Sequence, residues 1–334
     1  MHLLPAVVVE PQSAIIEPMP ANDGMPCVWS RRSLLLALAA GSVTALSGCR
    51  VQLEEGAPHI PLVPTRVPMI DEKALLAVLG RTTTLETLAK AVGGASTSIA
   101  GRLSAVHATQ VAVISRLLRD GGVPQSLSGT SATTGPAAPA TAGVSPQAAL
   151  SVAETDSVSD VSAADMSTDH VALIGSMLAQ RTAAATLLGG TAAPVVPSGL
   201  NGAEAMGLLA AVRAAVYGFE VVAAQVDKTG RALATSTLAS LRTGVSELET
   251  MAGSLGTPPP LGYQLPFPVT DTRSARRLAL HLLEALLTRQ AASLEPAAGD
   301  AAALATLVRW LGATEVMASR WGASLTAFPG LTNA

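Results

Sequence analysis

The side chains in this sequence that could bind a metal ion or carry a proton are few and widely spaced. A two-metal site inside a helical bundle needs four carboxylates and two imidazoles, with Glu-x-x-His on two of the helices so that both ligands point inward. Glycine, serine or leucine, and never glutamate, stands three positions before His59, His107, His170 and His281. The sequence therefore predicts no catalytic residue, no metal centre and no bound cofactor.

Three residues are nevertheless candidates for a polar site. His281 and Glu284 are three positions apart, so on a helix they share one face, where they bind a ligand or form a solvated pair. Glu220 lies beside the apolar positions of another predicted helix. It could be a buried carboxylate, paired with Arg213 or with an arginine of the predicted helices 272–295 or 300–325, or it could be a functional acid.

Other polar groups have a functional and a structural interpretation. Asp165, Asp169 and His170 could bind a divalent ion, but acidic residues also favour the positive end of a helix dipole. We expect His107, in the middle of a predicted helix, to form an interhelical hydrogen bond or to lie on the surface.

Three arginines begin one predicted helix: Arg273, Arg276 and Arg277. They form a solvated face, or they touch lipid headgroups or an acidic partner. The chain has no Gly-rich phosphate loop, no Gly-x-Ser-x-Gly and no His-Glu-x-x-His. Its net charge of −3 offers no basic field to attract nucleic acid. We therefore favour a protein without catalytic activity that does not bind nucleic acid.

The segment 30–49, SRRSLLLALAAGSVTALSGC, has the parts of an export signal. Arg31 and Arg32 supply a positive region, and residues 34–46 form an apolar stretch too short to span a membrane. The ending Leu-Ser-Gly-Cys resembles the lipobox of bacterial lipoproteins. That resemblance implies that the Cys49 thiol receives a diacylglycerol and becomes the new N-terminus. Two acyl chains anchor stably because each buried methylene contributes about 0.8 kcal/mol, so we predict a protein held on the extracytoplasmic face of the cell membrane.

The arginine pair and the leucines after it also look like a twin-arginine signal, which implies export in a folded state; the general secretory route is the alternative. The remaining alternative is that residues 33–47 form a buried helix or a simple membrane anchor. Residues 1–24 are too acidic for the positive region of a signal, so we predict Met25 as the true start, with Met19 as the alternative. Processing would remove Cys27 and consume Cys49, which leaves no thiol for a disulfide or a nucleophile.

The rest of the chain is typical of helices. Hydrophobic residues make up 49% of the sequence and aromatic ones only 2%, so alanine, leucine and valine dominate. Apolar runs after residue 50 are interrupted by charge, and we predict no membrane span there. Residues 50–70 are rich in proline and form a tether. Four helical segments follow, with a flexible linker at 121–147: 71–92, where Asp71 is the N-cap, 96–118, 147–164 and 168–188.

The second half repeats this plan. The predicted helices are 202–227, 231–254, 272–295 and 300–325, with a turn at 228–230 and caps at Asp271 or Thr270 and at Asp300. The proline-rich connection 255–270 can extend roughly 50 Å, longer than the 36 Å or so of the helix before it. It can therefore cross the whole bundle. We predict an all-α fold of two tandem four-helix bundles, at 71–190 and 200–328, with the single long crossover of ferritin-like folds in the second and, by the same pattern, in the first.

Several short motifs of the second half carry a family resemblance: Val216-Tyr217-Gly218-Phe219, Gly262-Tyr263-Gln264-Leu265-Pro266-Phe267-Pro268-Val269, Ala275-Arg276-Arg277-Leu278, Arg320-Trp321-Gly322 and Phe328-Pro329-Gly330. They look like the ferritin-like DUF4439 family of actinobacteria, over about 200–330. The resemblance implies a ferritin-like bundle and no established activity. An acidic residue and a histidine commonly precede the aromatic motif in that family. Val212 and Arg213 stand there in this chain, so a metal role is not carried over.

These observations favour a lipid-anchored binding or interaction module whose partner is an unknown protein or a small-molecule ligand held between helices. The alternative is a ferritin-like metal-binding or oxidoreductase-derived protein with a degenerate metal site. A third possibility is a transport accessory or cell-wall assembly factor.

Overall fold

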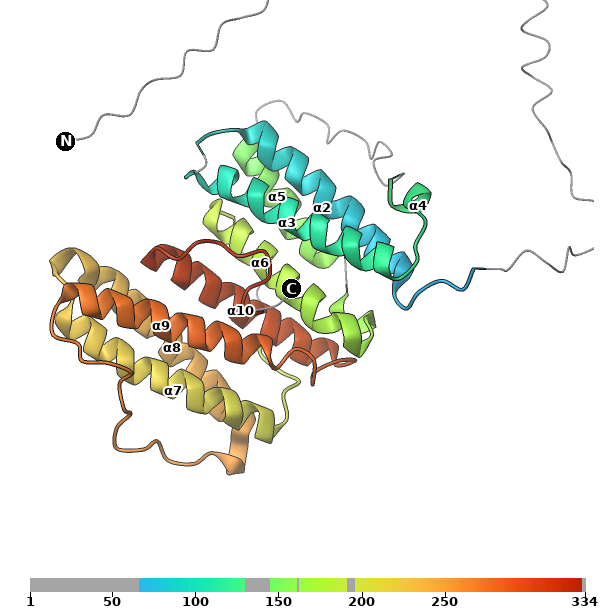
Figure 1. Cartoon of the computed structure of the whole chain (residues 1–334). Coiled ribbons are helices and arrows are strands. Elements are labelled where there is room, and N and C mark those ends of the chain that lie inside the picture. Colours follow the sequence, from blue (N-terminus) through green and yellow to red (C-terminus); the bar gives the residue numbers. More distant parts are fainter. Residues whose placement is uncertain (1–65, 96, 130–144, 161, 191–195, 332–334) are drawn as a thin grey trace, which may run out of the picture. The chain divides into compact units, whose positions relative to one another are not determined.

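The computed structural model describes residues 66–95, 97–129, 145–160, 162–190 and 196–331, which are helices and connecting segments without a β-strand (Figure 1). The predicted signal, with Arg31, Arg32 and Cys49, lies outside the described residues, as do most of the tether and the middle of the linker. The all-α prediction is confirmed for the described part of the chain.

The first group of helices contains α2 (Glu72–Val92), α3 (Ile99–Asp120), α5 (Pro146–Ser159) and α6 (Thr168–Leu187). Helix α2 packs against α3 and α5, and α5 packs against α6. A short helix, α4 (Gln125–Gly129), begins inside the segment predicted as a linker, and a single 3-10 turn, η2 (Ala163–Asp165), precedes α6.

Asp71 occupies the N-cap position of α2, as predicted, but its side chain makes no capping bond there. Its carboxylate instead accepts hydrogen bonds from the backbone N–H and the hydroxyl of Ser167, at 2.9 and 2.6 Å, where α6 begins. The left-handed backbone of Asp71, with φ of 60°, turns the carboxylate toward α6, and aspartate tolerates this conformation better than most residues.

The second group contains α7 (Gly202–Gln225), α8 (Lys228–Ala252), α9 (Thr272–Ala291) and α10 (Ala301–Trp321), with a 3-10 turn, η3 (Gly253–Leu255), after α8. Asp271 and Asp300 cap α9 and α10 as predicted. Asp227 caps α8, so residues 228–230 form the first turn of this helix and not the separate turn that we predicted. In each case an aspartate oxygen accepts a hydrogen bond from an otherwise unpaired backbone N–H of the first turn, and this bond fixes where the helix begins.

The connection between α8 and α9 runs the length of the bundle. Leu255, just after α8, lies beside Gly202, where α7 begins. At the other end, the Thr272 hydroxyl donates to the carbonyl of Gln225, where α7 ends, at 3.2 Å. Residues 256–271 therefore span the whole of α7, as the predicted crossover requires.

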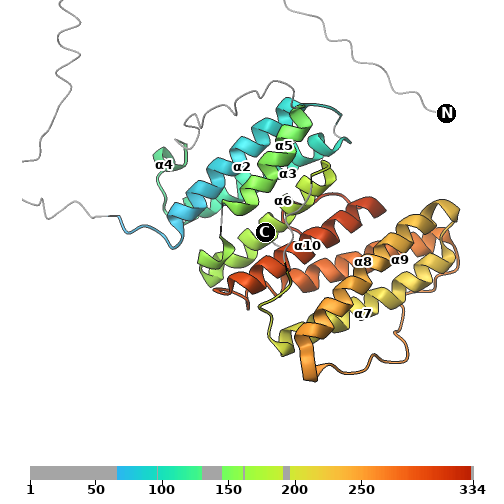
Figure 2. The ribbon, with the colours of Figure 1, turned by 180° about the vertical axis from the view of Figure 1, so that it is seen from behind.

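The two groups share one core through α6 and α10. These helices lie side by side in both views (Figures 1 and 2), and α10 packs against α6 as well as against α9. Gly312 of α10 permits this close approach, because a Cβ there would lie 2.8 Å from the carbonyl oxygen of Ala179. Everything described from Arg66 onward belongs to one compact unit. The tandem bundles that we predicted thus meet in a continuous core.

The C-terminal segment, residues 322–331, returns across the first group. The Gln110 amide donates to the carbonyl of Ala327, and the Ser176 hydroxyl donates to the carbonyl of Pro329, both at 2.8 Å. Glu315 of α10 accepts from the backbone N–H of Thr326 at 3.0 Å. These bonds tie the end of the chain to α3, α6 and α10.

Two described helices, α7 and α10, are long and apolar enough to cross a membrane by length and composition, contrary to our expectation. Helix α10 lies between α6 and α9, and most of its residues are buried. Helix α7 packs against α8 and α9. Burial in the core accounts for the apolar composition of both helices.

Candidate functional site

The candidate residues of the second group lie on its surface. Glu220 is exposed and forms an ion pair with Arg242 of α8 at 2.9 Å. The predicted ion pair therefore exists, but the expected burial and the expected partners, Arg213 or an arginine of α9 or α10, are wrong. His281 and Glu284 are exposed on α9. The His281 ring packs edge-on against Phe267, with 6.2 Å between ring centres.

The acidic residues near His170 do not converge on a metal site. Asp165 and Asp169 are exposed, whereas the His170 Nδ1 lies 2.9 Å from the Asp71 carboxylate. Burial would raise the pKa of Asp71, but hydrogen bonds from Ser167 and His170 outweigh it and hold the pKa below its usual value. Among the described residues, no three His, Cys, Asp or Glu side chains are grouped as metal ligands.

The arginines at the start of α9 are exposed. The Arg277 guanidinium lies over the Phe267 ring, 4.2 Å from its centre, which is a cation–π contact. The structure therefore gives this arginine an intramolecular partner.

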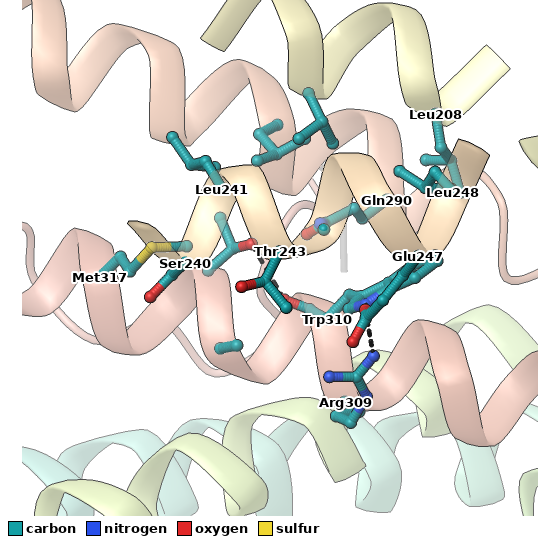
Figure 3. A pocket seen from close by; sticks show the side chains of 15 residues that line it. Leu208, Ser240, Leu241, Thr243, Glu247, Leu248, Gln290, Arg309, Trp310 and Met317 are labelled. Carbon is teal, nitrogen blue, oxygen red and sulfur yellow. Dashed lines mark hydrogen bonds and ion pairs between the residues drawn. The ribbon is translucent and has the colours of Figure 1, made fainter. Parts of the chain in front are cut away.

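A pocket of about 270 Å³ lies between α8 and α10 (Figure 3). Helix α8 packs chiefly against α7 and meets α10 at only a few positions, so the two helices leave a gap. Apolar side chains from all four helices of the second group form most of its wall: Leu208, Val212, Leu241, Leu248, Leu286, Trp310 and Met317.

An ion pair lies at one side of the pocket. The Glu247 carboxylate accepts hydrogen bonds from the Arg309 guanidinium at 2.6 Å and from the Trp310 indole N–H at 2.7 Å (Figure 3). Both charged side chains are partly exposed. The two bonds hold the carboxylate and the indole in fixed orientations along the pocket wall.

Gln290 of α9 is the unusual polar residue of this pocket. It is only 4% exposed, and its amide oxygen has no hydrogen-bond partner among the described residues. The pocket hydroxyls of Ser240, Thr243 and Thr314 bond to backbone carbonyls of their own helices, so they do not satisfy the amide. A buried polar atom without a partner costs about 1–3 kcal/mol, and such atoms are rare in folded proteins. The pocket thus offers one unsatisfied amide in apolar surroundings.

Our sequence analysis missed Gln290. The available signal was its position, because it follows Leu286 by four residues on the buried face of α9. A glutamine at a core position of a helix must find a partner or remain unsatisfied.

The interior of the first group holds a different polar cluster. Arg181, Glu154 and His107 have no exposed surface. The His107 Nε2 lies 2.7 Å from Glu154, and the Arg181 guanidinium donates to the Thr82 hydroxyl at 2.6 Å. Gln110 links the cluster to Gln180, donating to its amide oxygen at 3.0 Å. His107 is therefore the interhelical hydrogen-bonding residue that the sequence allowed.

Hydrogen bonding fixes most protons in this polar cluster. The Gln110 Nε2 donates to the carbonyl of Ala327, so its Oε1 must face the His107 Nδ1, 3.2 Å away, which therefore carries a hydrogen. The His107 Nε2 on the other side of the ring lies 2.7 Å from the Glu154 carboxylate. Burial lowers the pKa of Arg181 to about 10, with Glu154 opposing the shift, so Arg181 stays charged at neutral pH. That fixed positive charge disfavours a metal cation in this position.

Comparison with known proteins identifies one region. Residues 204–333 match the family model described as "Domain of unknown function (DUF4439)". No curated protein and no solved structure matches the chain. The matched region covers α7 to α10 and therefore includes the whole pocket. The second half of the chain thus carries a domain of the DUF4439 family, as its motifs indicated.

Proposed function

We propose that the protein is a binding protein that holds a small, mostly apolar molecule in the pocket between α8 and α10. The observation that carries the proposal is Gln290, a buried amide whose oxygen has no partner among the described residues and which lies in a mostly apolar wall. Pockets for small ligands combine such a wall with a few polar groups that fix orientation.

The dimensions and chemistry of the pocket limit the ligand. A volume of about 270 Å³ suits a small aromatic molecule of two or three rings. A hydrogen-bond donor on the ligand would satisfy the Gln290 oxygen, and the ligand's polar end would lie toward Glu247 and Arg309. We expect no catalysis, because these groups offer neither an activated nucleophile nor a general base with a partner.

The experiment uses residues 66–334, which form one compact unit with its own core. The probe is N-phenyl-1-naphthylamine, a neutral aromatic amine with one N–H group whose fluorescence rises in apolar surroundings. We expect it to bind the native sequence. Gly244→Phe should abolish binding, because a Cβ at Gly244 meets only Val212, at 3.9 Å, and the ring would occupy the pocket.

The matched control is Ala239→Phe, which adds the same ring on an exposed face of α8 outside the pocket. This variant should bind the probe like the native sequence, and Gln290→Leu should weaken binding by about tenfold, the value of one good hydrogen bond. If Gly244→Phe binds the probe as well as Ala239→Phe does, the pocket is not the site and the proposal fails.

We also propose that the protein acts outside the cell, anchored by a lipid on Cys49. The support is the sequence of residues 30–49, with Arg31, Arg32 and the Leu-Ser-Gly-Cys ending. Mass spectrometry of the N-terminal peptide from membranes should find a diacylglyceryl Cys49. A mature protein that retained residues 26–48, or a cytosolic form with an unmodified thiol, would contradict this location.

The alternative, a ferritin-like protein with a degenerate metal site, draws support from the crossover between α8 and α9, which passes along the whole of α7. We propose that the second group has ferritin-like topology. Elemental analysis of the purified protein distinguishes the functions, since near-stoichiometric iron, manganese or zinc would favour metal binding over the apolar ligand.

A further inference from the structure

A second cavity, of about 430 Å³, lies on the other side of α7 and α8, beneath the crossover. It shares no lining residue with the pocket between α8 and α10. Its walls come from α7, α8 and the crossover prolines Pro259 and Pro260. We call this cavity the crossover groove.

Two tyrosines from distant parts of the chain meet in the crossover groove. Tyr217 of α7 and Tyr263 of the crossover have ring centres 5.6 Å apart, with their planes inclined at 48°. Both are partly exposed, and neither hydroxyl has a hydrogen bond within the part of the chain that the structure describes. The groove therefore presents aromatic surface together with two free phenol groups.

Charged side chains line the same groove as two ion pairs. Arg213 lies 2.8 Å from Glu249, and Arg242 lies 2.9 Å from Glu220. The lining charges cancel, so the groove does not favour an ionic ligand. The pair of Arg242 and Glu220 is well exposed, with 60% and 49% of the side-chain surface accessible. Exposed pairs of this kind contribute only about 0–1 kcal/mol, so a ligand can rearrange them easily.

We propose that the crossover groove binds a neutral saccharide. A pyranose ring has an apolar C–H face that packs on an aromatic ring, and its hydroxyls both donate and accept hydrogen bonds. The carboxylates here accept and the guanidiniums donate, so the groove offers partners for both roles of a sugar hydroxyl. Pro259 and Pro260 add a rigid wall that loses little entropy on binding.

A proline-rich peptide is the competing occupant, because aromatic-lined grooves also bind such peptides. The saccharide fits better, because four of the side chains that line the groove end in a carboxylate or a guanidinium, and these groups form hydrogen bonds with sugar hydroxyls. A peptide in polyproline conformation offers few donors to the two carboxylates.

Isothermal titration calorimetry of residues 66–334 with maltotetraose, cellotetraose and tetra-N-acetylchitotetraose tests the proposal. At least one of these neutral sugars should bind. Tyr263→Ala should raise its Kd by about tenfold, the upper range for an aromatic contact. Tyr263→Phe should retain most of the affinity, and Arg242→Ala, on the surface, should weaken it without affecting folding. Gln264→Ala, a neighbour outside the groove, is the matched control and should change nothing.

Three results would overturn the proposal. One is the absence of binding by all three sugars up to about 10 mM, which is weaker than any useful recognition. Another is sugar binding that Tyr263→Ala and Arg242→Ala leave unchanged. The third is binding of decaproline that Tyr263→Ala abolishes while the sugars do not bind, which would assign the groove to a peptide. Gly244→Phe should leave sugar binding intact, so the result is independent of the pocket between α8 and α10.

Discussion

The interiors of the two helix groups differ in chemistry although both consist of four long helices. The interior of α2, α3, α5 and α6 contains a buried histidine hydrogen-bonded to a glutamate, and a buried arginine hydrogen-bonded to Thr82. The interior of α7 to α10 is lined mainly by leucine, valine and aromatic side chains, and it leaves a pocket. The first interior holds its own internal cation, Arg181, whereas the second leaves a pocket. Both interiors contain a buried amide atom without a partner among the described residues, Gln180 Nε2 in the first and Gln290 Oε1 in the second.

This difference assigns separate roles to the two groups. A buried hydrogen-bonded cluster requires specific partners at specific positions, so it favours one arrangement of its helices. An apolar wall has no such requirement and accepts a guest of matching shape. We infer that the first group is structural and the second receives ligands, and the following variants test that division.

The largest expected effect follows from removing the buried carboxylate. Glu154→Ala leaves Arg181 as a buried charge without its neighbouring counter-charge, which destabilises a protein by about 3–5 kcal/mol. Glu247→Ala, in the second group, removes a carboxylate that is partly exposed, and we expect a loss of about 1–2 kcal/mol because water can reach Arg309. Urea unfolding of both variants measures the difference. Equal losses would show that the two interiors do not differ as we infer.

The features of the fold that depend on neighbouring residues could be predicted from the sequence. Helix ends followed from capping aspartates such as Asp271 and Asp300, and the crossover followed from chain length and proline content. Asp71 occupies an N-cap position without capping, because its left-handed backbone turns the carboxylate away from its own helix. A cap can be predicted where the side chain bonds within its own turn, and cannot where it bonds to another helix.

The polar cluster and the pocket could not be predicted because both depend on tertiary packing. His107 lies 47 residues from Glu154, and Gln110 lies 70 residues from Gln180, so no motif with short spacing connects them. The pocket exists where α8 does not reach α10, which is a matter of helix placement. Glu220 illustrates the reverse error, since its position beside an apolar seam suggested burial but its side chain reaches Arg242 at the surface.

The next largest effect concerns a glycine at the junction of the two groups. Gly312→Ala would place a Cβ 2.8 Å from the Ala179 carbonyl, and the α6 backbone cannot move aside as a side chain can. We expect overpacking to lower stability by about 1–3 kcal/mol. Thermal unfolding should still show one transition, at a lower Tm. A stability equal to that of the native sequence would contradict the shared core.

The same substitution beside the pocket should act in the opposite direction. At Gly244 a Cβ meets only Val212, at an ordinary contact distance of 3.9 Å. Because alanine favours a helix interior over glycine, Gly244→Ala should stabilise the protein by up to about 1 kcal/mol. Thermal unfolding of Gly244→Ala and Gly312→Ala side by side gives the sign of each change. A loss of stability at both sites would indicate that the second interior is packed as tightly as the junction.

The smallest effect should come from Glu315, which lies on α10 at the junction. Burial raises the pKa of Glu315 above its usual value of 4.5, while hydrogen bonds from Thr326 oppose that rise. The folded protein therefore holds this proton more tightly than the unfolded chain does. The resulting stabilisation is complete below pH 4.5 and is lost as the pH rises through the folded pKa.

Glu315→Gln removes this titration and keeps an oxygen that can accept from Thr326. We expect the variant to gain stability relative to the native sequence as the pH rises from 4.5 toward neutrality, as measured by urea unfolding at several pH values. A stability difference between the variant and the native sequence that does not change with pH would show that burial does not raise the pKa of Glu315. In that case an ionised Glu315 would cost little free energy at the junction between α6 and α10. The junction would then resemble the partly exposed pocket more than the fully buried polar cluster of the first group.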